Sequence, residues 1–126
     1  TWRIDRNGCE GVGFAALGPD GALLGPAIDL APSCGCAACV DPTIAWSGSG
    51  FGMAWSDYSA DADGETVAAI VGPGGSPVSI HGRITTGGSV AGWNALAWTG
   101  TGYGAAWRDL RTGSHGIWAT FFTACE

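Results

Sequence analysis

IAWSGSGFGMAWSD at Ile44–Asp57 and LAWTGTGYGAAWRD at Leu96–Asp109 are nearly the same sequence. Corresponding tryptophans lie 52 residues apart, from Trp46 to Trp98 and again from Trp55 to Trp107. A period near 50 residues lies in the range of propeller blades and well above the roughly 33 to 34 residues of helical-pair repeats. The pattern therefore predicts a repeat protein whose unit is built from strands.

Four strands are predicted in each unit. Short aliphatic and aromatic runs indicate two strands joined by Ser-Gly-Ser-Gly, a connection that suits a tight hairpin. A third strand ends at the turn Gly72–Ser76, and the fourth alternates so that Ile80, Gly82 and Ile84 share one face. The four predicted strands are Thr43–Trp46, Phe51–Trp55, Thr66–Val71 and Val78–Thr86.

The repeat is incomplete at both ends of the chain. Thr1–Arg3 resembles Ala106–Arg108, and Val12–Leu17 resembles Val67–Val71, so the first copy lacks its first strand. Gly116–Phe122 takes the place of a third strand, and no fourth follows. We expect three, four and three strands, in a partial blade at 1–42, a full blade at 43–94 and a partial blade at 95–126. No pattern supports a helix, so the predicted class is all-β.

These residues resemble a tandem-repeat family of secreted and cell-surface bacterial proteins, with units of the form Ala-Trp-x-Gly-x-x-Tyr-Gly-Val-x-Trp-x-Asp. The similarity is strongest at 43–57 and 95–109, extends to Arg83–Thr85, and departs at Trp2–Asp5 and at 32–42. The resemblance implies β-propeller blades of four antiparallel strands. It implies an extracellular, periplasmic or cell-surface location and is silent on function.

About two and a half blades cannot close a ring, because propellers typically need about four to eight. The chain is then either a piece of a longer polypeptide or one of several chains that complete a ring, as in a similar two-blade lectin that trimerises. Open edge strands promote aggregation. We therefore expect another protein chain, or further copies of this one, to cover the edges near Trp2 and Phe121.

The charge balance restricts the partners. Five arginines, no lysine and eleven acidic residues give a net charge of −6 over 126 residues. An acidic surface argues against nucleic acid and against anionic membranes. No apolar run reaches the roughly 18 residues of a membrane span, and no signal peptide is visible, so we expect a secreted form to be the processed product.

Tryptophan is abundant, with seven residues in the chain. The four that recur with the repeat, Trp46, Trp55, Trp98 and Trp107, are expected to pack between blades, with a sugar-stacking surface as the alternative. Trp93 and Trp118 have no evident equivalents in the other copies, which makes them better ligand candidates. With Arg108 and His81 they form the predicted sugar site of a lectin-like binding module.

Three cysteines lie within six residues, at Cys34, Cys36 and Cys39, and the others are Cys9 and Cys125. Disulfides are the favoured interpretation for a secreted domain. A metal site of thiolates or a redox thiol remain alternatives, because this spacing lets sulfurs converge on one ion. An odd count leaves one thiol over, and the connectivity does not follow from the sequence.

Four acidic residues define a candidate calcium site, the one cofactor considered: Asp57, Asp61, Asp63 and Glu65. Their spacing fits the twelve-residue calcium loop poorly, so a solvated acidic turn is favoured. Asp57 and Asp109 recur with the repeat and are expected to bond local backbone.

Catalytic patterns are scarce. His81 and His115 fit a strand and a turn better than a general base, and no serine lies on a strand-to-helix elbow. The leading interpretation is a non-catalytic extracytoplasmic scaffold or binding segment of a larger assembly. The alternatives are a carbohydrate-binding lectin completed by oligomerisation, and a metal-binding or redox protein that uses Cys34, Cys36 and Cys39.

Overall fold

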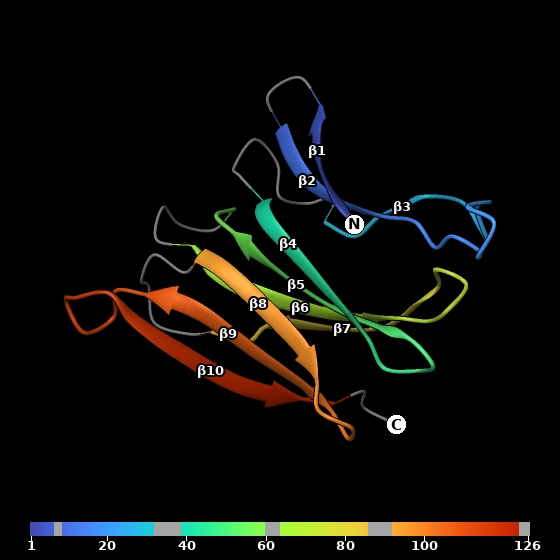
Figure 1. Cartoon of the computed structure of the whole chain (residues 1–126). Coiled ribbons are helices and arrows are strands. Elements are labelled where there is room, and N and C mark those ends of the chain that lie inside the picture. The colour runs from blue at the N-terminus through green and yellow to red at the C-terminus, as the bar shows by residue number, and fades with distance from the viewer. Residues whose placement is uncertain (7–8, 32–38, 60–63, 86–91, 124–126) are drawn as a thin grey trace.

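The computed structural model describes residues 1–6, 9–31, 39–59, 64–85 and 92–123, with positions 6 and 77–81 described by their backbone alone. These residues form ten strands in three antiparallel sheets and no helix, so the all-β prediction is confirmed (Figure 1). No helix long and apolar enough to cross a membrane occurs in this described part of the chain.

Each sheet is a meander in which strands that follow one another in sequence are paired, and none of the three closes on itself. The strand numbers of three, four and three agree with the prediction. The N-terminal sheet contains β1 (Trp2–Arg6), β2 (Cys9–Phe14) and β3 (Ile28–Asp29). The central sheet contains β4 (Cys39–Trp46), β5 (Phe51–Asp57), β6 (Glu65–Val71) and β7 (Pro77–Arg83). The C-terminal sheet contains β8 (Gly92–Trp98), β9 (Tyr103–Asp109) and β10 (Gly116–Phe122).

The two repeated hairpins have the same hydrogen bonds. Ser47 N donates to Gly50 O at 2.9 Å, and Thr99 N donates to Gly102 O at 2.9 Å. The hydroxyls of Ser47 and Thr99 donate to the same carbonyls, at 3.0 and 2.8 Å. The second residue of each turn has φ near +98° (Gly48, Gly100), which glycine adopts without steric cost. The predicted tight turns are therefore confirmed.

A β-bulge near the start of β4 and of β8 is a second shared feature. The pairing register shifts between Val40 and Thr43, and again between Gly92 and Ala95. Asp41 and Trp93, 52 residues apart, both have φ of 55°. Trp93 therefore has an equivalent in the central sheet, contrary to the sequence interpretation. The two copies share a backbone conformation at this position but not a residue type. The equivalence of Asp41 and Trp93 is therefore not visible in the sequence.

Strands β4 and β8 also begin earlier than expected, at Cys39 and Gly92, because each continues through its bulge.

A bulge changes the pairing of β7 as well. Gly82 pairs with Ala68 and Ile80 with Ala69, so the register passes over His81. The strict alternation predicted for this strand is therefore wrong, since one extra residue reverses the faces on either side of it.

The central sheet packs its Phe51, Met53 and Trp55 face against the N-terminal sheet. The rings of Phe14 and Phe51 meet edge to face with centroids 5.3 Å apart. Burial of this apolar surface is the main stabilising contribution in the chain. The core consists of Val12, Phe14, Ala16, Leu30, Ala31, Cys39, Met53, Trp55, Val67, Ala69 and Val71.

The C-terminal sheet packs the equivalent face, with Tyr103 and Trp107, against the other side of the central sheet. The Tyr103 ring lies over Gly52, where a Cβ would come within 2.4 Å of it, and its hydroxyl donates to Gly50 O at 3.2 Å. Each later sheet thus uses one repeated face to contact the sheet before it, and the three sheets follow one another as layers (Figure 1).

Polar bonds join the same two sheets at the other end of the strands. Asn94, next to the bulge residue of β8, donates to Ser56 Oγ at 2.9 Å and accepts from Thr66 Oγ1 at 3.0 Å. Ser56 and Thr66 are fully buried, so these bonds satisfy groups that would otherwise be costly. Sequence analysis did not single out Asn94.

A paired glycine substitution tests the layer contact. Gly52→Ala should lower the free energy of unfolding by about 1–3 kcal/mol, because the new Cβ overlaps the buried Tyr103 ring. Gly74→Ala is the control, since a Cβ there meets nothing within 4 Å. Urea denaturation followed by tryptophan fluorescence measures both. Equal stability of the two variants would contradict the described contact.

Candidate functional site

Of the four residues predicted to bind a sugar, the structure brings Trp93 and Arg108 together and places Trp118 elsewhere. The Arg108 guanidinium lies 4.1 Å from the centre of the Trp93 ring, which is 69% exposed. Trp118 pairs with Trp107 in the register while Arg108 pairs with Ile117, so Trp118 and Arg108 face opposite sides of the sheet. His81 lies in β7, where only the backbone is described.

Trp118 also has an equivalent in the central sheet. Trp107 pairs with Trp118 as Trp55 pairs with Val67, which places Trp118 at the position of Val67. The guanidinium of Arg111 lies 4.5 Å from the Trp118 ring centre. Trp118 is therefore half-buried against its own sheet and is a weaker ligand candidate than Trp93.

Tyr58 lies close to the bulges. Burial raises the pKa of its phenol, the nearby Asp41 carboxylate raises it further, and the Arg108 cation lowers it. The neutral phenol is therefore favoured. The Tyr58 ring covers Gly64, whose φ is +68°, and its hydroxyl oxygen would lie 3.7 Å from a Cβ at Gly92.

Asp109 anchors the end of β9. Its buried carboxylate accepts from Trp107 Nε1 at 3.1 Å, from the Arg111 backbone N–H at 2.7 Å and from the Arg111 guanidinium. The hydrogen bond to Asp109 is the main reason why the pKa of Arg111 is raised. Asp57, its equivalent, accepts from the Ser59 backbone N–H at 2.7 Å. The prediction that both aspartates bond local backbone is confirmed.

The proposed calcium ligands are only partly described. Asp57 is used by its own turn, and Glu65 is buried, where its carboxylate accepts from Thr85 Oγ1. Asp61 and Asp63 lie outside the described residues. Within the described ranges, no group of three or more histidine, cysteine, aspartate or glutamate side chains could hold a metal ion. The calcium site stays a prediction.

The cysteines are likewise only partly described. Cys9 begins β2 and Cys39 begins β4, and each is disulfide-bonded. A sulfur in a disulfide is not available as a thiolate ligand. Cys39 is therefore not available to the proposed thiolate site, whereas Cys34, Cys36 and Cys125 lie outside the described residues, so their roles and the connectivity stay predictions.

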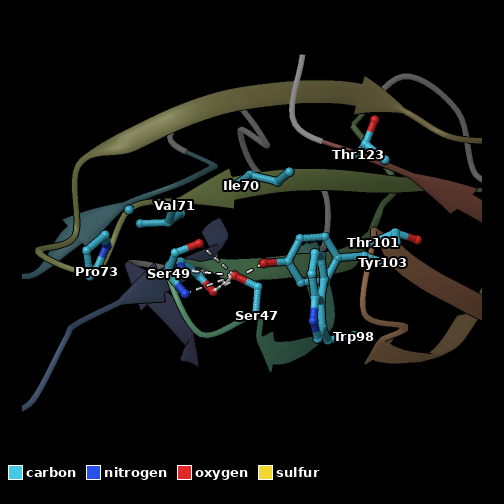
Figure 2. Close-up of a pocket in the computed structure, with 11 residues that line it drawn as sticks. Ser47, Ser49, Ile70, Val71, Pro73, Trp98, Thr101, Tyr103 and Thr123 are labelled. Carbon is cyan, nitrogen blue, oxygen red and sulfur yellow. Dashed lines mark hydrogen bonds between the residues drawn. The ribbon is translucent and has the colours of Figure 1, made fainter. Parts of the chain in front are cut away.

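A cleft of about 690 Å³ opens where the hairpins of the central and C-terminal sheets lie side by side (Figure 2). None of the predicted ligand residues lines it. Its walls are the β4–β5 hairpin, the turn after β6 and the β8–β9 hairpin. The lining residues are Ser47, Ser49, Gly50, Ile70, Val71, Gly72, Pro73, Trp98, Thr101, Tyr103 and Thr123.

Trp98 shows why sequence analysis missed this cleft. All four recurring tryptophans were expected to pack between blades. Trp55 and Trp107 are buried, whereas Trp46 is 47% exposed and Trp98 is 37% exposed. The last two lie at the hairpin ends, where the Trp46 ring is tilted against Phe51 and the Trp98 ring meets Tyr103 edge to face, with ring centroids 4.6 and 4.9 Å apart. The recurrence of two tryptophans in each copy does not reveal which of them is buried against the preceding sheet.

Comparison with family models, with curated proteins and with solved structures finds no match to this chain. The functional argument therefore depends on the geometry and on the residues themselves.

The aspartate pair provides a test of the electrostatic anchor. Asp109→Asn should lower the free energy of unfolding by about 1–3 kcal/mol, because it removes a buried charge paired with Arg111. Asp57→Asn should have a smaller effect. Trp55 Nε1 has no hydrogen-bond partner among the described residues, so Asp57 lacks the bond that Asp109 accepts from Trp107, and the asparagine oxygen can still accept from the Ser59 backbone N–H. Thermal unfolding compares them, and a larger loss for Asp57→Asn would contradict the assignment.

Proposed function

We propose that this chain is a non-catalytic, extracytoplasmic binding segment whose stack of propeller-like sheets is continued by a further sheet, supplied by a second copy of the chain. One observation carries the proposal. In the central sheet, one face is buried under the C-terminal sheet. The equivalent face of the C-terminal sheet is an exposed apolar surface.

The face in question is the side of β9 and β10 that points away from the central sheet, called here the outer face. It contains Gly104, Ala106, Arg108, Ile117, Ala119 and Phe121. Ile117 is 79% exposed and Phe121 is 74% exposed. Because large apolar side chains at such exposure mark interaction surfaces when they lie together, this face is a candidate docking site.

Equivalent positions in the central sheet support the assignment. Gly52, Ala54 and Ser56 in β5 correspond to Gly104, Ala106 and Arg108 in β9, and all three are buried under the C-terminal sheet. In β6, Thr66, Ala68 and Ile70 correspond to Ile117, Ala119 and Phe121 and are also buried. The internal interface therefore gives the geometry in which a further sheet would lie on the outer face.

The N-terminal sheet presents the complementary surface. Trp2 pairs with Gly13 as Trp55 pairs with Val67, so Trp2 lies on the face that later sheets turn toward the sheet before them. Trp2 is 42% exposed and its ring covers Gly13. One end of the stack thus offers the receiving face and the other offers the inserting face. Head-to-tail contacts of this kind form a ring when the rotation between copies closes and an open filament when it does not.

Self-association tests this proposal. Sedimentation velocity over increasing protein concentration should show assemblies larger than the chain, and Phe121→Glu should shift them to monomer because it places a charge in an apolar contact. Leu24→Glu, at an exposed apolar position in a loop of the N-terminal sheet, is the matched control and should keep the assembly. A wild-type protein that stays monomeric at all concentrations would contradict the proposed partner.

A further inference from the structure

We propose that the cleft between the two hairpins binds a neutral saccharide, with one sugar ring on the Trp98 indole and its hydroxyls on Ser49, Thr101 and Thr123. This site is distinct from the four residues considered from sequence, and it does not depend on occupancy of the outer face.

The cleft is held open by regular structure. Its sides are the equivalent turns Ser47–Gly50 and Thr99–Gly102, each closed by the same backbone and hydroxyl bonds. Tyr103 bridges the sheets beneath them through its hydroxyl bond to Gly50 O. The volume of about 690 Å³ lies within the roughly 300–1,000 Å³ typical of small-molecule sites. The shape is therefore set by the repeat.

The lining chemistry selects the ligand class. None of the eleven lining residues is charged, which disfavours phosphate, carboxylate and cationic ligands. Five of them carry hydroxyl groups, Ser47, Ser49, Thr101, Tyr103 and Thr123, and Trp98 adds an exposed aromatic surface. Pyranose rings combine an apolar C–H face with a rim of hydroxyls. That combination matches an aromatic surface surrounded by hydroxyl side chains.

The hydrogen bonds made within the chain determine which lining hydroxyls are available to bond a ligand. Ser47 Oγ accepts from the backbone N–H of Gly50 at 3.0 Å and of Ser49 at 3.3 Å, so it serves its own turn. Ser49 Oγ has only a 3.4 Å contact with Ser47 Oγ. Thr101 and Thr123 side chains make no hydrogen bond within the described residues, and Figure 2 shows both beside the cleft. These three hydroxyls can therefore bond a ligand.

Trp46 provides a matched comparison for Trp98. Each ends the first strand of a hairpin with a four-residue turn, and each ring contacts a neighbouring aromatic ring. The N-terminal sheet begins with β1 and β2 and has no turn equivalent to Ser47–Gly50 in its described residues, so no second hairpin of that kind faces Trp46 there. Of these two tryptophans, Trp98 is the one that combines a partly exposed indole with a second hairpin opposite among the described residues.

The first experiment is a titration with neutral methyl glycosides of glucose, galactose, mannose, fucose and N-acetylglucosamine, followed by amide NMR, and a neutral-glycan array. At least one sugar should give saturable shifts at the Ser49, Thr101 and Thr123 amides. Trp98→Ala should weaken its binding by about tenfold or more, a change of about 1.4 kcal/mol. Trp46→Ala should change the affinity by less than about twofold.

Further variants keep the test decisive. Thr101→Val removes one hydroxyl while keeping the side-chain shape, and it should also weaken sugar binding. It replaces Trp98→Ala as the test if that variant does not fold. Phe121→Glu should leave sugar binding unchanged, which separates this site from the proposed assembly. Absence of saturable binding to every glycoside and glycan, or shifts that map to Trp93 and Arg108 instead, would overturn the proposal.

Discussion

The structure depends on one aromatic ring in each later sheet that packs back onto the sheet before it. Tyr103 fills the space that Gly52 leaves by lacking a side chain, and Phe51 meets Phe14 in the preceding layer. A ring and a facing gap set the position of one sheet relative to the next, because close packing tolerates little displacement. The hydroxyl of Tyr103 and the amide of Asn94 then fix the two ends of the same interface.

The stacked layers create both candidate surfaces. The layers bring equivalent hairpins side by side and form the cleft around Trp98 and Thr101. The same repetition leaves the outer face, with Ile117 and Phe121, without a covering sheet among the residues that the structure describes. Binding at the cleft and assembly at the outer face are thus separate consequences of a single packing rule. Neither requires catalytic residues.

Much of the fold could be predicted because the residues that form its turns and strands recur in the sequence. Gly48 and Gly100 mark turns that need a left-handed residue, and the aromatic spacing around them marks the strands. The bulges could not be predicted, since Asp41 and Trp93 share a backbone conformation and no side-chain chemistry. The separation of Trp118 from Arg108 could not be predicted either, because the face that each occupies depends on the pairing register of β9 and β10, which the sequence does not specify.

The cleft was missed because Ser49, Thr101 and Trp98 were interpreted as turn and packing residues, and their proximity depends on how the sheets stack.

The most direct test of that stacking is a nuclear Overhauser measurement between the Tyr103 ring protons and the Gly52 α-protons. We expect strong cross-peaks and an upfield ring-current shift of the Gly52 α-protons, because the ring lies directly over that glycine. No cross-peak and an unshifted glycine would contradict the proposed layer packing and both surfaces inferred from it.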